Sequence, residues 1–195
     1  MRVAFEANQA REILRALKLS KEFNLQPITT GAREADEVAA DLKAAIVRVI
    51  YSLNYPTRPR TLAPDADESI ETLRNRAEAP NRPAALAKAG VTFGFASAGL
   101  NDPKDFVKNA AKAIKGGLAE DLAIRALTIN AATIAGVGDR LGSIEKGKIA
   151  NLVVADGNLF DEKTKITRVF VAGRAVSLDA PAPAGGGRGR GRGGQ

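Results

Sequence analysis

The side chains that could do chemistry stand at the ends of apolar segments. One carboxylate, four hydroxyl residues and two amides occupy such positions: Glu6, Asn8, Thr29, Thr30, Ser52, Asn54 and Ser97. If the segments are parallel strands, their carboxyl ends meet at one rim, where βα folds build their sites. We expect a polar pocket for a small molecule there. Five residues are candidates for contacting that molecule: Asn8, Thr29, Ser52, Asn54 and Ser97.

Each candidate also has a purely structural interpretation. Glu6 is either a lone ligand or base, or a polar residue at a strand end that faces a loop. Thr29 and Thr30 either bind a substrate oxyanion or cap the helix that follows Gly31. The charge run Asp65, Asp67 and Glu68 is interpreted as a solvated part of a proline-rich loop rather than a carboxylate metal site.

Composition narrows the possible chemistry further. The 195 residues include no histidine and no cysteine. This excludes disulfides, cysteine nucleophiles and the usual zinc ligand sets, and leaves only carboxylates, carbonyls and water as metal ligands. The net charge is +7, and Arg188, Arg190 and Arg192 in the C-terminal tail supply three of those charges.

Strands and helices are expected to alternate along the first 115 residues. The expected strands are Val3–Ala7, Leu25–Thr30, Ile46–Leu53 and Val91–Ser97. The expected helices are Ala10–Phe23, Arg33–Ala45, Pro83–Ala89 and a helix that starts at Asp102-Pro103 and ends before Gly116. Strands separated by helices of this length indicate βαβ units and a parallel sheet. Four such units amount to half of a (β/α)8 barrel.

The C-terminal part has a different pattern. Two further helices are expected at Glu120–Leu127 and Ala131–Ala135, followed by strands of a small antiparallel sheet at Leu152–Ala155, Thr167–Val171 and Ala175–Leu178. We therefore divide the chain into a partial barrel (1–140), a small β segment (141–179) and a disordered Gly/Arg-rich tail (180–195). The tail is interpreted as a solubilising segment rather than an RNA-binding one, because no aromatic residues separate its arginines.

Several segments carry a resemblance to a known family. The segment RALTINAATIAGVGDRLGSIEKGKIANLVVADG at Arg125–Gly157 resembles the C-terminal signature of metal-dependent amidohydrolases, in particular those similar to imidazolonepropionase. Two other pieces add to it: ALAKAGVTFGFAS at Ala85–Ser97 and VFVAGRAV at Val169–Val176. The resemblance implies an α/β fold, the C-terminal half of a TIM-like barrel followed by a small antiparallel β segment. It also implies hydrolysis of non-peptide carbon–nitrogen bonds with zinc or another divalent metal.

The same resemblance shows which site residues are changed. Members of the family carry metal-binding histidines at the ends of the fifth and sixth barrel strands, where this chain has Glu6 and Thr30. They carry a metal-binding, proton-accepting aspartate after the eighth strand, where this chain has Ala98. Alanine can neither bind a metal nor accept a proton, so we expect no metal in this chain and assign no catalytic residue.

Two functional classes remain open. The chain is a fragment or catalytically degenerate copy of a hydrolase, or it is a non-catalytic half-barrel module that stabilises or regulates a catalytic amidohydrolase. A second copy or a missing N-terminal half-barrel is the expected partner, and neither nucleic acid nor a membrane is expected. Residues 1–5 do not form a signal peptide, so the cytoplasm is the default compartment unless an export signal lies upstream of Met1.

Overall fold

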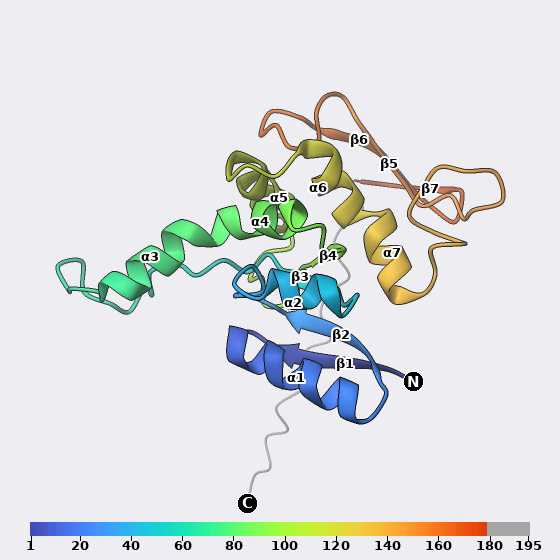
Figure 1. The fold of residues 1–195 in the computed structure, drawn as a ribbon. Coiled ribbons are helices and arrows are strands. Elements are labelled where there is room, and N and C mark those ends of the chain that lie inside the picture. Colours follow the sequence, from blue (N-terminus) through green and yellow to red (C-terminus); the bar gives the residue numbers. More distant parts are fainter. Residues whose placement is uncertain (179–195) are drawn as a thin grey trace, which may run out of the picture.

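The computed structural model describes residues 1–178, and its first half is built on a four-stranded parallel sheet (Figure 1). The strands are β1 (Arg2–Ala7), β2 (Gln26–Gly31), β3 (Arg48–Ser52) and β4 (Phe93–Ala96). They lie in sequence order, β1-β2-β3-β4, and all are parallel. This confirms the predicted fold class of an α/β half-barrel, in which both outer strands are left as edges.

Helices connect and cover these strands. They are α1 (Ala10–Glu22), α2 (Ala39–Ala44), α3 (Ile70–Glu78), a 3-10 turn η1 (Ala79–Asn81), α4 (Arg82–Lys88), α5 (Asp105–Lys115), α6 (Glu120–Leu127) and α7 (Ile129–Ala135). No helix within residues 1–178 is both long and apolar enough to cross a membrane.

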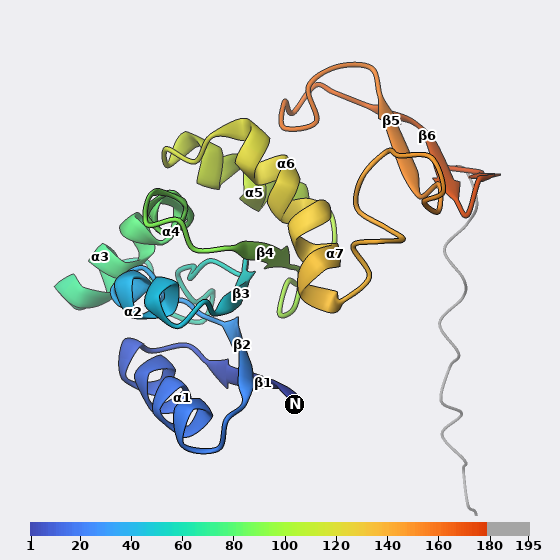
Figure 2. The ribbon, with the colours of Figure 1, turned by 45° about the vertical axis from the view of Figure 1, so that its right-hand side comes forward.

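The two faces of the parallel sheet have different surroundings. Val49, Tyr51 and Phe93 share one face of the sheet and belong to the buried core. Helices α1, α2 and α4 lie on one side of the sheet (Figure 2). Residues of the opposite parity, such as Ala4 and Glu6, point to the other face and are exposed. Helix α7 approaches that face near β4. A Cβ on Gly94 would lie 3.0 Å from the Ala131 Cα, so glycine permits this contact.

The second sheet is antiparallel and consists of β5 (Leu152–Ala155), β6 (Ile166–Val171) and β7 (Arg174–Val176), in the order β5-β6-β7. Val153, Val169 and Val176 are directly paired across its strands and therefore share one face. Val153 is 59% exposed and Val176 is 45% exposed, so this valine face is largely uncovered.

The structure corrects two helix predictions. The expected helix Arg33–Ala45 is reduced to α2, Ala39–Ala44, because tertiary contacts hold the preceding residues in turns. The Glu34 carboxylate accepts a hydrogen bond from the Ala10 N–H at 2.9 Å, and Arg82 donates to the Arg33 carbonyl at 2.6 Å. The helix expected from Asp102-Pro103 begins only at Asp105, since the Asp102 side chain accepts from the Lys104 N–H and closes a turn. The tail prediction, 180–195, lies outside the described residues.

Candidate functional site

Glu6 and Thr30 are neighbours at the carboxyl end of the parallel sheet. They are directly registered across β1 and β2, so both side chains project to the open face. Glu6 is exposed, whereas Thr30 is half-buried and its hydroxyl donates to the Phe5 carbonyl at 3.3 Å. The two positions thus offer a solvated carboxylate beside a hydroxyl whose proton is already engaged.

Ser52 and Ala98 form a second pair at the same end of the sheet. The Ser52 hydroxyl donates to the Ala98 carbonyl at 3.3 Å and accepts from the Asn54 N–H at 3.2 Å. Ser52 therefore fixes the loop after β4 instead of presenting a free hydroxyl. Ile50 of β3 is registered with Thr30, and Ser52 lies two residues further along the same strand.

The two candidate amides each lie against a glycine in the left-handed region. Gly31 has φ +80°, and a Cβ there would lie 2.5 Å from the Asn8 Oδ1. Gly99 has φ +82°, and a Cβ there would lie 2.8 Å from the Asn54 Nδ2. Both amides are half-buried, so they stand at the rim with part of their surface open.

The last two candidates differ in accessibility. Ser97 is exposed, and its carbonyl accepts from the Leu100 N–H at 3.1 Å in a turn. Thr29 is fully buried and is registered with Phe5 and Val49, on the covered face of the sheet. Its hydroxyl oxygen has no hydrogen-bond partner among the described residues. The Thr29 side chain is therefore not presented at the rim.

Two residues that the sequence-based reasoning missed organise this rim. Glu12 accepts hydrogen bonds from the Gln9 N–H at 3.0 Å and the Asn8 N–H at 2.8 Å, and these bonds lower the pKa of Glu12. The Gln9-x-x-Glu12 spacing of a capping box could have revealed it. Buried Asn109 of α5 donates to the Leu53 carbonyl at 2.8 Å and so holds the end of β3. No pattern in the sequence marks Asn109.

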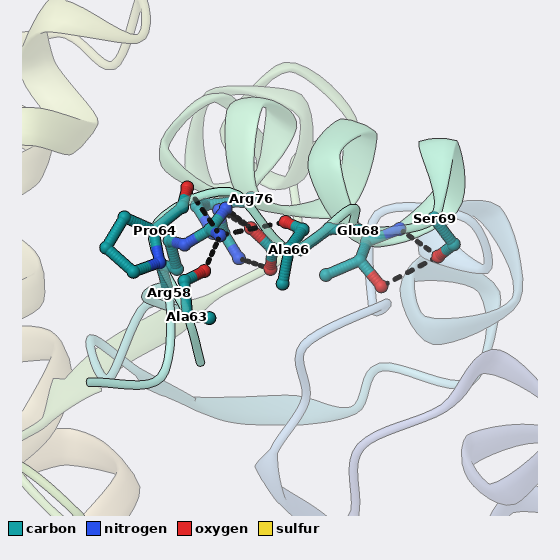
Figure 3. A network of polar contacts seen from close by, with 8 residues as sticks. Arg58, Ala63, Pro64, Ala66, Glu68, Ser69 and Arg76 are labelled. Carbon is teal, nitrogen blue, oxygen red and sulfur yellow. Dashed lines mark hydrogen bonds and ion pairs between the residues drawn. The ribbon is translucent and has the colours of Figure 1, made fainter. Parts of the chain in front are cut away.

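The long loop after β3 is held together by ion pairs and hydrogen bonds of charged side chains (Figure 3). Glu68 was expected to be a solvated residue, but its side chain is only 7% exposed. It pairs with Arg76 at 2.5 Å and with Arg58 at 2.8 Å, and the Arg76 contact lowers its pKa. The Arg58 guanidinium also donates to the Ala63, Pro64 and Ala66 carbonyls. The two arginine partners of Glu68 lie eight and ten residues away along the chain, and composition alone does not identify such pairs.

The rim residues do not fit a divalent metal. Zinc sites in proteins use several nitrogen, sulfur or carboxylate ligands arranged around one point. The three positions that correspond to the family's metal ligands supply one carboxylate from Glu6, one hydroxyl from Thr30 and a methyl group from Ala98. Within residues 1–178, no three His, Cys, Asp or Glu side chains are grouped closely enough to hold an ion.

Known proteins share this architecture. An amidohydrolase from Thermotoga maritima MSB8 is 29% identical with a TM-score of 0.74, over 91% of this chain and 43% of its own. A Xaa-Pro dipeptidase with bound methionine is 20% identical, with a TM-score of 0.67 over 90% of this chain and 45% of its own. A zinc-bound adenosine deaminase from Xanthomonas campestris is 21% identical, with a TM-score of 0.59 over 90% and 45%.

The chain thus spans about half the length of these solved relatives. No curated protein matches it. The sequence profile described as "Amidohydrolase family" matches residues 29–176, which is most of the chain, from β2 through the whole second sheet. The chain belongs to the amidohydrolase family.

Proposed function

We propose that this chain is a catalytically degenerate part of a hydrolase for non-peptide carbon–nitrogen bonds, and that it does not hydrolyse such bonds alone. The observation that supports this most strongly is Ala98 after β4, joined to Ser52 through its carbonyl. Its methyl side chain stands where the resemblance places the carboxylate that binds metal and accepts the proton of the attacking water.

The chemistry shows why this loss is severe. A bound divalent metal lowers the pKa of its water to about 7 and polarises the scissile carbonyl. Glu6 is the one carboxylate among the three changed positions. The Thr30 hydroxyl beside it donates its hydrogen bond to the Phe5 carbonyl. A single solvated carboxylate next to an engaged hydroxyl provides neither the metal nor the charge complementarity that this reaction requires.

What the rim retains is the capacity to bind a small polar molecule. The side chains of Asn8 and Asn54 are half-buried, and Ser97 is exposed. Amides and hydroxyls in such positions supply both donors and acceptors for a polar substrate. Binding without turnover is the property we expect of the rim as it stands.

A second function is favoured by the uncovered face of the parallel sheet. β1 is an edge strand, and Ala4 and Glu6 on its open face are exposed. Parallel sheets in α/β proteins are normally covered on both faces. A module that stabilises or regulates a catalytic amidohydrolase would use this face to contact its partner.

Zinc binding tests the proposed function. We expect purified parent protein, dialysed against buffer without chelator, to contain far less than one zinc per chain. The triple variant Glu6→His, Thr30→His and Ala98→Asp should gain a calorimetric zinc signal, since two imidazoles and a carboxylate suit zinc. Its affinity should be modest, because the groups that orient metal ligands are missing.

A matched control carries the same residue types at scattered exposed positions: Glu22→His, Thr57→His and Ala40→Asp. Zinc binding by the control equal to that of the site variant would show that the three positions do not form a site. Stoichiometric zinc in the parent, or metal-dependent hydrolysis by it, would refute the proposed function.

A further inference from the structure

The two edges of the parallel sheet are protected unequally. At the β4 edge, the carbonyls of Thr92 and Ala96 face β3, where they accept from the Val49 and Leu53 N–H groups. The Phe93 carbonyl points the other way, to the free side of β4, where it accepts a hydrogen bond from the Asn130 side chain of α7 at 3.0 Å. Helix α7 therefore covers part of the β4 edge, which is one way that proteins protect edge strands.

The β1 edge has no such cover among residues 1–178. The Met1 and Ala7 carbonyls face β2, where they accept from the Gln26 and Ala32 N–H groups at 2.9 Å each. By alternation, the backbone groups of Arg2, Ala4 and Glu6 point to the free side. No backbone hydrogen bond from these three residues to another strand exists on that side.

These three residues are self-complementary. If a second β1 lies antiparallel with Ala4 opposite Ala4, then Arg2 lies opposite Glu6 of the second copy, and Glu6 lies opposite its Arg2. All three residues then form hydrogen-bonded pairs that use every free N–H and C=O on that side. Opposite charges placed directly across strands stabilise the pairing, and this arrangement has two such pairs related by symmetry.

The side chains at this edge are available for that pairing. Arg2 and Glu6 are exposed, and neither side chain has a hydrogen bond or ion pair among residues 1–178. The Arg2 guanidinium lies beside Gly136, close enough that a Cβ there would be 2.8 Å from its Nη1. Without a hydrogen bond to hold it, the arginine can turn towards a neighbouring strand.

Helix α1 extends the same surface. A hollow of about 270 Å³ along the edge is lined by Phe5, Ala7, Arg15 and Leu19 among others. Leu19 is 45% exposed, and Phe23, one helical turn further along the same side, is 63% exposed. Because α1 packs over β1 and β2, pairing of two β1 strands would bring the two α1 helices to about 10 Å, a normal helix packing distance.

We propose that the β1 edge is a dimerisation surface whose occupant is a second copy of this chain, paired antiparallel through β1 about a two-fold axis at Ala4. The contact is isologous, as expected for a two-fold dimer. It joins the two parallel sheets into one and covers Leu19 and Phe23 of both copies.

Charge reversal tests the register. The full-length protein is measured by light scattering and sedimentation, and the parent should be a dimer. Arg2→Glu and Glu6→Arg should each weaken dimerisation about tenfold or more, because each replaces two cross-strand attractions with repulsions. The double variant Arg2→Glu and Glu6→Arg should recover nearly all of the parent affinity, since the opposite charges again face each other.

A cysteine at the axis provides a second test that does not depend on affinity. The parent has no cysteine, so Ala4→Cys introduces the only thiol. Hydrogen-bonded antiparallel neighbours have Cα atoms about 5.5 Å apart, within reach of a disulfide. Mild oxidation should link Ala4→Cys into covalent dimers and leave the control Ala40→Cys, on the exposed side of α2, as monomers.

Several results would overturn the proposal. A monomeric parent would do so, as would a dimer that tolerates both single reversals. Equal cross-linking of the two cysteine variants would also contradict it. So would a chain that stays monomeric until a separate first half-barrel is added, because the edge would then accept a parallel strand from a different partner.

Discussion

At the scale of single residues, Thr29 and Thr30 show how one step along a strand changes what a hydroxyl does. Thr30 donates to the Phe5 carbonyl, whereas the Thr29 oxygen is buried and unpaired among the described residues. A buried polar group without a partner costs about 1–3 kcal/mol of desolvation. The same residue type is thus favourable at position 30 and unfavourable at position 29.

Replacing each threonine with valine should therefore have opposite effects. We expect Thr29→Val to raise the free energy of unfolding by about 1 kcal/mol, because valine has nearly the same shape and no hydroxyl to desolvate. Thr30→Val is the matched control and should lower it by about 1 kcal/mol, since it removes a hydrogen bond. Urea unfolding of both variants measures this. A loss of stability in Thr29→Val would show that its hydroxyl has a partner, such as an ordered water.

Glu12 should make the stability of the rim depend on pH. Its bonds from the Gln9 and Asn8 N–H groups lower its pKa below the ordinary value of 4.5. The stabilisation is complete above about pH 4.5 and is lost as the pH falls through the lowered pKa. Glu12→Gln should therefore be less stable than the parent near neutral pH, and the difference should shrink under acid conditions. Glu22→Gln, in the last turn of the same helix, is the matched control for the loss of one charge.

At the scale of elements, hydrophobic patterning was enough to predict the strands and their parallel order, because local propensity and burial favour the same structure there. It was not enough to predict elements whose ends are set by tertiary contacts. The first part of the expected helix Arg33–Ala45 is held in turns by Arg82, which lies 49 residues away from Arg33. The candidate site was predictable to the same extent. The predicted strand ends place the candidate residues at one rim, but which face of the sheet Thr29 occupies depends on the strand register, which this sequence alone does not specify.

The loop after β3 shows an element that is ordered by ion pairs. Glu68→Gln should release Arg58 and Arg76 and speed amide hydrogen exchange in residues 58–68, because a neutral amide holds two guanidinium groups less strongly. Asp65→Asn is the matched control, since Asp65 is exposed and makes no ion pair among the described residues. The parent should show the same loosening when the pH falls through the lowered pKa of Glu68. Unchanged exchange in Glu68→Gln would mean that the carbonyl contacts of Arg58 order the loop alone.

At the scale of the whole molecule, the two sheets have different support. The parallel sheet shares a core with five of the helices, including buried Leu42 and Leu86. The antiparallel sheet contributes none of its strand residues to that core. Its connections to the first half include one hydrogen bond, from the Asn158 amide to the Glu120 carboxylate at 2.9 Å, and the half-buried ring of Phe160. Its valine face is largely open to solvent.

We therefore expect the molecule to unfold in two steps rather than one. Three strands with an uncovered apolar face gain little free energy from burial, and regions with few buried contacts open most easily. Native-state hydrogen exchange should show amides of β5 and β6 opening at a lower free energy than those of β2 and β3. Asn158→Ala should lower the opening energy of the second sheet further and leave that of β2 and β3 unchanged. If all four strands opened at one common free energy, the second sheet would be part of the same cooperative unit, and its valine face would have to be covered in solution.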